Sequence, residues 1–160
     1  MSDDTIKQDF YSKVDTVLTT NSLWNGVGFT TYRDFDMEGM TSEPARPFIF
    51  IGSRNTAVIP KYLPYIILDI ELDRYVFQMG STSTLVRVSI NILGRTEGEA
   101  SRIASVLKDN VVTFGSYNAQ QQTDTQGKSW SEQALPIPEP AWSEGTLRQL
   151  LSISSEFIVM

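Results

Sequence analysis

The chain has 160 residues, with 13 basic and 19 acidic side chains, a net charge of −6, and neither histidine nor cysteine. The absence of cysteine excludes disulfide frameworks and thiolate metal sites, and the absence of histidine excludes Ser-His and Cys-His hydrolases. The length predicts one domain, and the acidic balance argues against gripping nucleic acid over a broad face.

The first predicted element is an amphipathic helix over residues 4–20. Its apolar side chains recur at helical spacing, and Asp3 and Asp4 lie at its N-terminus, where they complement the helix dipole. Residues 21–46 contain several glycines and prolines and are expected to form a long loop, with one short strand at 28–35. Residues 47–51 predict a short buried strand.

The clearest pattern lies between residues 63 and 93. Apolar residues from Leu68 to Leu72 alternate with Asp69, Glu71 and Asp73, which is the period of a half-buried strand. A second alternating run surrounds Arg87, and a Gly/Ser-rich turn at 80–83 separates the two. This pattern predicts a β-hairpin in which acidic side chains of the first strand pair with Arg87.

A capping box from Thr96 to Glu99 opens a second predicted helix over about 97–112. A polar, proline-bearing arm follows at 116–146, and alternating apolar residues at 151–159 predict a final strand.

The element order predicts an α+β fold: an antiparallel or mixed sheet with a central β-hairpin, flanked by two helices on one face. We expect a single domain over residues 1–160, with a core of about 4–20, 47–114 and 147–160. The neighbours of each strand are left open.

No catalytic or cofactor-binding constellation is evident, and we predict that the protein is not an enzyme and holds no cofactor and no metal. Asp69, Glu71 and Asp73 are compatible with a hard-cation site, but such spacing along one strand is more typical of a solvated face. An acidic run at residues 34–38 is a weaker calcium candidate, because it lacks the spacing of a calcium loop.

Aromatic side chains in the two irregular segments are the candidate interface residues. The 21–46 loop and the 116–146 arm contain aromatic residues in a polar context, a composition typical of groups that bury against a partner. Packing within the same subunit is an equally good explanation for the tryptophans of the arm. The candidate interface residues are Trp24, Phe29, Tyr32, Phe35, Trp130 and Trp142.

About a third of the chain resembles the core of bacteriophage neck and tail-terminator proteins. The similarity comprises the strand at residues 59–72 with Arg74, the Phe-Gln-Met-Gly corner at 77–80, and the strand at 85–93. It continues in the Gly-Arg-Thr-Glu-Gly-Glu-Ala segment at 94–100 that opens the second helix. Met79 stands where leucine is more usual in these proteins, and Gly94 replaces another small residue.

The resemblance implies a tail-terminator-like subunit that forms a ring, usually a homohexamer, at the head–tail junction. Its partners are then copies of itself, the tail tube, the head connector and, in contractile tails, the sheath. DNA is expected to pass through the lumen without specific binding. This function implies a virion protein assembled in the host cytoplasm, without a membrane association, and the N-terminal sequence lacks the pattern of a signal peptide.

Two alternatives remain open at the sequence level. Another phage or contractile-injection-system assembly module, such as a baseplate or tail completion protein, shares the same physical requirements. A small carboxylate- and metal-dependent enzyme is the less favoured alternative.

Overall fold

The structure is a computed structural model that describes residues 3–20, 48–51, 65–76, 82–94, 97–115, 119–135 and 149–159. Two helices and six strands follow one another along these residues. The helices are α1 (Asp3–Thr20) and α2 (Glu97–Asn110). The strands are β1 (Phe48–Ile51), β2 (Tyr65–Val76), β3 (Thr82–Gly94), β4 (Gln120–Gln121), β5 (Ser131–Ala134) and β6 (Gln149–Val159).

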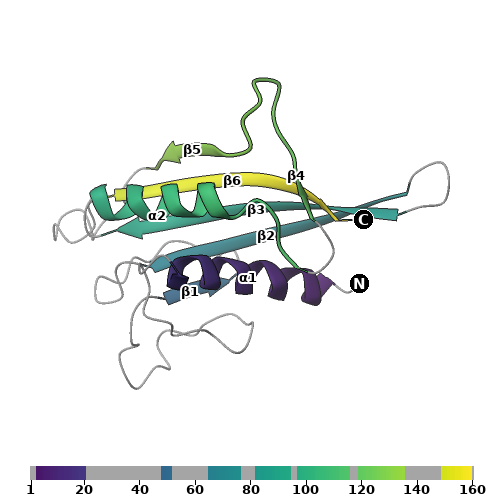
Figure 1. Cartoon of the computed structure of the whole chain (residues 1–160), viewed down its shortest axis with the longest axis horizontal. Coiled ribbons are helices and arrows are strands. Elements are labelled where there is room, and N and C mark those ends of the chain that lie inside the picture. The colour runs from purple at the N-terminus through teal and green to yellow at the C-terminus, as the bar shows by residue number, and fades with distance from the viewer. Residues whose placement is uncertain are drawn as a thin grey trace, which may run out of the picture.

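The strands form one mixed sheet in the order β1-β2-β3-β6-β4, and β5 also pairs with β6. The only parallel pair in the described sheet is β1 with β2; the other pairs are antiparallel. Strands β2, β3 and β6 are long and lie side by side in the centre (Figure 1). The predicted α+β class and the central β-hairpin are therefore confirmed.

The hairpin register explains why the alternating sequence forms this sheet. Leu68 of β2 lies opposite Ile90 of β3, and Ile90 in turn lies opposite Ile153 of β6. All three side chains are buried on the same face, because residues paired across antiparallel strands share a face. A one-residue slip would move every apolar side chain of a strand to the other face, so this register is strongly specified.

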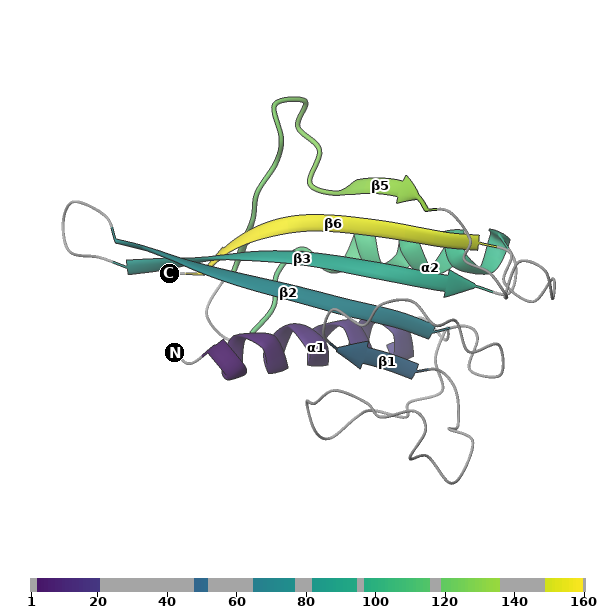
Figure 2. The same ribbon diagram turned by 180° about the vertical axis from the view of Figure 1, so that it is seen from behind.

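Both helices cover this apolar face, as predicted. Figures 1 and 2 show α1 and α2 on the same side of the sheet, in front of it in one view and behind it in the other. The side chains of α1, α2, β2, β3 and β6 that are buried between the helices and this face form one hydrophobic cluster. Those of the helices are Ile6, Phe10, Tyr11, Val14, Val17, Leu18, Ala100, Ile103, Ala104 and Leu107.

The opposite face of the sheet, called the outer face below, changes from apolar to acidic along β2. Tyr65 and Ile67 are buried there, together with Leu93 of β3. Further along β2 the outer-face positions are Asp69, which is half-buried, and Glu71, which is exposed. Among the described residues, no helix covers this acidic part of the outer face.

Part of the segment expected to form an arm adds two short strands to the sheet. Strands β4 and β5 lie within the 116–146 segment that we expected to form an arm outside the core, and both pair with β6. Lys108 of α2 also forms an ion pair with Glu132 of β5. The sequence pattern missed these strands because their Gln, Ser and Glu side chains show no apolar alternation. The strands themselves join the sheet mainly through their backbone groups.

Other boundaries agree closely with the predictions. Helix α1 begins one residue before the predicted range, and α2 ends at Asn110 rather than at residue 112. The predicted strand at 28–35 lies outside the described residues, as does the capping residue Thr96. No helix of the described segments has both the length and the apolar character needed to cross a membrane.

Candidate interaction surface

A loop interrupts the sheet edge next to β6. Gln121 of β4 pairs with Phe157, whereas Ser131 of β5 pairs with Ser154. Residues 122–130 therefore lie opposite only Ser155 and Glu156, and most of them project beyond the edge (Figure 1). We call residues 122–130 the edge loop. Such an interruption prevents a further strand from adding smoothly to this edge.

The tip of the edge loop is a tight turn fixed by hydrogen bonds. The Asp124 N–H donates to the Lys128 carbonyl at 2.9 Å, and the Gly127 N–H donates to the Asp124 carbonyl at 3.0 Å. Gly127 has a φ of 79°, a left-handed conformation that glycine adopts without strain. This hydrogen-bond pattern with glycine at the left-handed position is that of a three-residue hairpin loop with a G1 bulge.

The Asp124 carboxylate provides additional order within this turn. Its Oδ1 accepts hydrogen bonds from the backbone N–H groups of Gln126, at 2.8 Å, and Lys128, at 2.9 Å. The hydrogen bonds from Lys128 and then Gln126 lower the pKa of Asp124 below its ordinary value. The turn is therefore ordered although its side chains from residue 123 to 128 are exposed.

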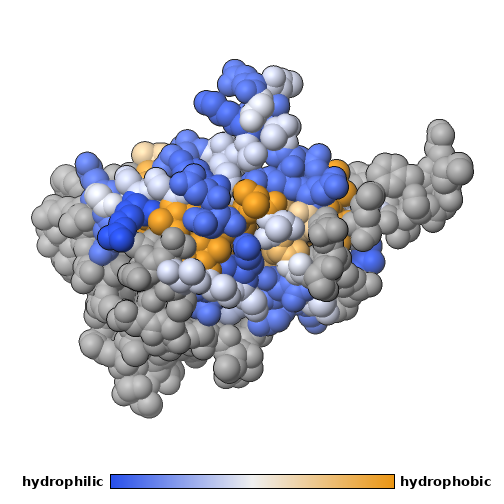
Figure 3. All heavy atoms as spheres, viewed as in Figure 1, coloured by the Kyte–Doolittle hydropathy of each residue, from blue (hydrophilic) through white to orange (hydrophobic). Residues whose placement is uncertain are grey.

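The base of the edge loop packs onto the core. The Ser155 hydroxyl accepts a hydrogen bond from Gln121 Nε2 at 2.9 Å and donates to the Ser129 carbonyl at 2.6 Å. Trp130 packs edge-to-face on Phe157, with ring centroids 6.3 Å apart. The edge loop is thus attached firmly at its base while its hydrophilic tip projects into solvent (Figure 3).

The edge loop borders a hollow of about 480 Å³ on the outer face. The floor comes from β2, β3 and β6, and the wall comes from the edge loop and the start of β5. The charged residues that line this hollow, which we call the outer-face groove, are Asp69, Glu71, Asp124, Glu156, Arg87 and Lys128. Several serines also line this hollow, and the hydroxyls of Ser131 and Ser154 lie 2.7 Å apart.

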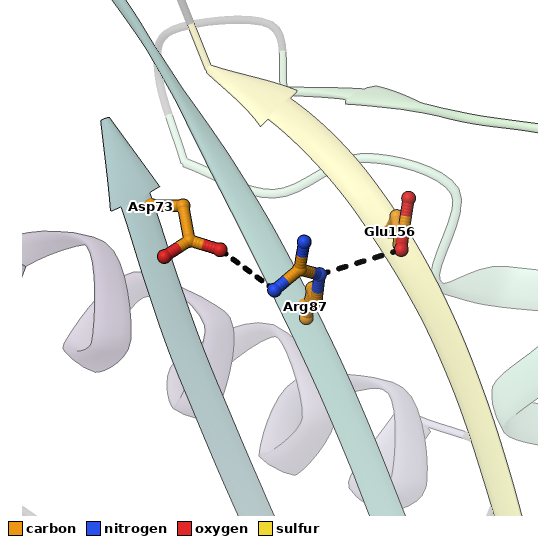
Figure 4. Close-up of polar contacts among 3 residues, drawn as sticks. All are labelled: Asp73, Arg87 and Glu156. Carbon is orange, nitrogen blue, oxygen red and sulfur yellow. Dashed lines mark hydrogen bonds and ion pairs between the residues drawn. The ribbon is translucent and has the colours of Figure 1, made fainter. Parts of the chain in front are cut away.

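Arg87 is the central cation of the outer face. Its Nη1 lies 2.7 Å from Asp73 Oδ2, and its Nε lies 3.5 Å from Glu156 Oε1, as Figure 4 shows. The predicted pairing of Arg87 with an acidic residue of the first strand is therefore confirmed. Glu71 lies directly opposite Arg87 in the register, but the guanidinium bonds to the diagonal Asp73 instead.

Two carboxylates of the outer-face groove have no such partner. Within the described part of the chain, neither Asp69 nor Glu71 forms an ion pair or a side-chain hydrogen bond. The groove is lined by four carboxylates and two cations, and one of these cations, Arg87, already forms ion pairs with Asp73 and Glu156. The groove is therefore net negative, with its unpaired acidic groups on β2.

The structure gives mixed outcomes for the candidate residues from the sequence. Of the predicted interface residues, Trp130 packs within its own chain against Phe157. Trp24, Phe29, Tyr32, Phe35 and Trp142 lie outside the described residues, as does the acidic run at 34–38. The described segments contain no cluster of three acidic side chains that is placed to hold a metal ion.

Sequence reasoning did not find the edge loop or the outer-face groove. A signal for the turn is present, because Asp124 followed by Gly127 is a common pattern of ordered hairpin loops. No family model matches this sequence, and a search of curated proteins likewise gives no match.

Proposed function

We propose that this protein is a structural subunit of the head–tail junction of a tailed bacteriophage. In this proposal it is a neck or tail-terminator protein that forms a ring, caps the tail tube and links it to the head connector. Such a subunit functions through its shape and its contacts with other proteins, and neither of these requires histidine or cysteine.

The observation that carries the proposal is the segment of the chain that resembles these proteins. Its described parts form β2, β3 and the start of α2. These elements are the centre of the fold, since β3 pairs with both β2 and β6 and α2 packs on the same sheet. The resemblance therefore concerns the elements that build the subunit rather than a peripheral addition.

The surface of the subunit supports a role in assembly. The edge loop, which also forms a wall of the outer-face groove, projects from one edge of the sheet, where it is available to contact an unlike surface of a neighbouring copy. Contacts between unlike surfaces are heterologous, and heterologous contacts close into rings when the rotation between copies permits it. The acidic net charge also suits a channel through which DNA slides, because carboxylates make no attractive contacts to phosphates.

The oligomeric state tests this proposal directly. Native mass spectrometry and negative-stain images of the purified chain are expected to show a closed ring of about six subunits, alone or after addition of tail-tube protein. Rings that bind the ends of tail tubes, and not their sides, would support the terminator position. A chain that stays monomeric with tail-tube protein present would refute the proposal.

A further inference from the structure

The outer-face groove has the properties of a docking site for a basic polypeptide segment. We propose that it receives an extended segment of a neighbouring tail or connector protein, and that arginine or lysine side chains of this segment pair with Asp69 and Glu71. This inference rests on the proposed function, because it assigns one of the contacts that a neck protein must make.

The arrangement of charges determines the chemistry of the partner. Asp69 and Glu71 are two positions apart on β2, so their side chains lie on the same face about 7 Å apart. Arg87 does not neutralise them, because its guanidinium is bonded to Asp73 and Glu156. Two basic side chains at alternate positions of an extended segment have the same spacing as these two carboxylates. One of them can therefore pair with Asp69 and the other with Glu71.

The shape of the groove favours a polypeptide segment. The floor crosses three strands, and the edge loop forms a wall on the side of β6. Hydroxyl groups of Ser89, Ser131 and Ser154 line the same hollow and supply donors and acceptors for a backbone. The ordered turn at Asp124 keeps this wall in place before a partner arrives, which lowers the entropic cost of binding.

The two helices of a second copy are a poor source for the basic segment. Helix α1 contains four acidic and two basic residues, and α2 contains three acidic and two basic residues. The helix side of another copy is therefore acidic and would meet the groove with like charge. A basic partner of a different sequence is the complementary choice.

The test uses the full chain and a short blocked glycine–serine peptide with two arginines at alternate positions. Binding is measured by calorimetry, and amide shifts by nuclear magnetic resonance show where the peptide lies. We compare the wild type with Asp69→Asn/Glu71→Gln. A matched control, Asp9→Asn/Asp109→Asn, removes the same charge from the helix side. The same peptide with citrulline in place of arginine tests the need for positive charge.

We expect the groove variant to weaken binding about fivefold or more, as the loss of two ion pairs implies. The control variant is expected to change binding less than about twofold, because its charges lie on the other side of the sheet and are screened by salt. Amide shifts should concentrate at residues 69–71 and 154–156, and the citrulline peptide should not bind.

Equal weakening in both variants would overturn the assignment, since it would indicate non-specific attraction to an acidic protein. Absence of binding, or shifts located away from the groove, would overturn it as well. Light scattering on the wild-type chain tests ring formation separately. A chain that stays monomeric with tail-tube protein present would refute the neck-ring proposal, whereas a ring without peptide binding would refute only the docking site.

Discussion

Replacement of Trp130 tests whether this residue stabilises its own chain or serves as a contact with a partner. The indole packs on the hydrophobic core and lies edge-to-face on Phe157, whose ring also contacts Phe10 and Phe114. Phe157 itself is fully buried. Trp130→Ala therefore removes one member of an aromatic cluster and opens the base of the edge loop.

The magnitude follows from burial and from ring contacts. A fully buried tryptophan costs about 3–5 kcal/mol when it is replaced by alanine. Trp130 is only partly buried, so we expect a loss of about 2–3 kcal/mol in the free energy of unfolding. For a chain of this size the loss corresponds to a fall of about 5–10 °C in the melting temperature.

Trp130→Phe is the matched variant for this measurement. It keeps an aromatic ring near Phe157 and removes an indole N–H that has no hydrogen-bond partner among the described residues. A buried donor without a partner costs stability, so the loss in this variant should be clearly smaller than with alanine. The difference between the two stability losses separates the contribution of ring packing from that of the indole N–H.

Urea unfolding of Trp130→Ala, Phe157→Ala and the double variant supplies the decisive assay. The pair should show a coupling of about 0.5–1.5 kcal/mol, as expected for edge-to-face aromatic rings. The loss caused by Trp130→Ala should not depend on protein concentration, because the contact lies within one chain. A loss below about 1 kcal/mol without coupling, or a loss seen only at concentrations that permit assembly, would refute the reasoning.

Three further predictions concern charged groups. Arg87→Ala should lower stability by only about 1 kcal/mol or less, because both of its ion pairs are exposed; urea unfolding that gives more than about twice this loss would contradict the prediction. Asp124→Ala should accelerate hydrogen exchange at the Gln126 and Lys128 amides and lower the melting temperature only slightly, because the turn is exposed. In the wild type, protection of these two amides from exchange should be present above the ordinary pKa of 3.8 and be lost as the pH falls through the lowered pKa of Asp124. Equal exchange rates in the wild type and the variant would refute this prediction. Burial raises the pKa of Asp15, so its charge opposes folding above that pKa. Asp15→Asn should therefore raise the melting temperature at neutral pH, and the gain should vanish as the pH falls below 3.8. A gain that stays constant with pH would exclude the buried charge as its cause.

The sequence by itself determined the central hairpin and the two helices. Alternation from Leu68 to Leu72 assigns each side chain to one face of a strand, and the burial of Leu68 and Ile70 follows from this pattern. The helical spacing of apolar residues likewise placed both helices against the sheet. These features are local, since a few neighbouring residues contain the whole signal.

Only the tertiary structure decided how the edge next to β6 is built. Strands β4 and β5 pair through backbone groups, which every sequence has, so their polar side chains carried no pattern to read. The position of Trp130 on Phe157 and the choice of Asp73 over Glu71 as the partner of Arg87 depend on where distant strands meet. The unpaired acidic groups of the outer-face groove result from that choice, because one guanidinium cannot satisfy every carboxylate around it.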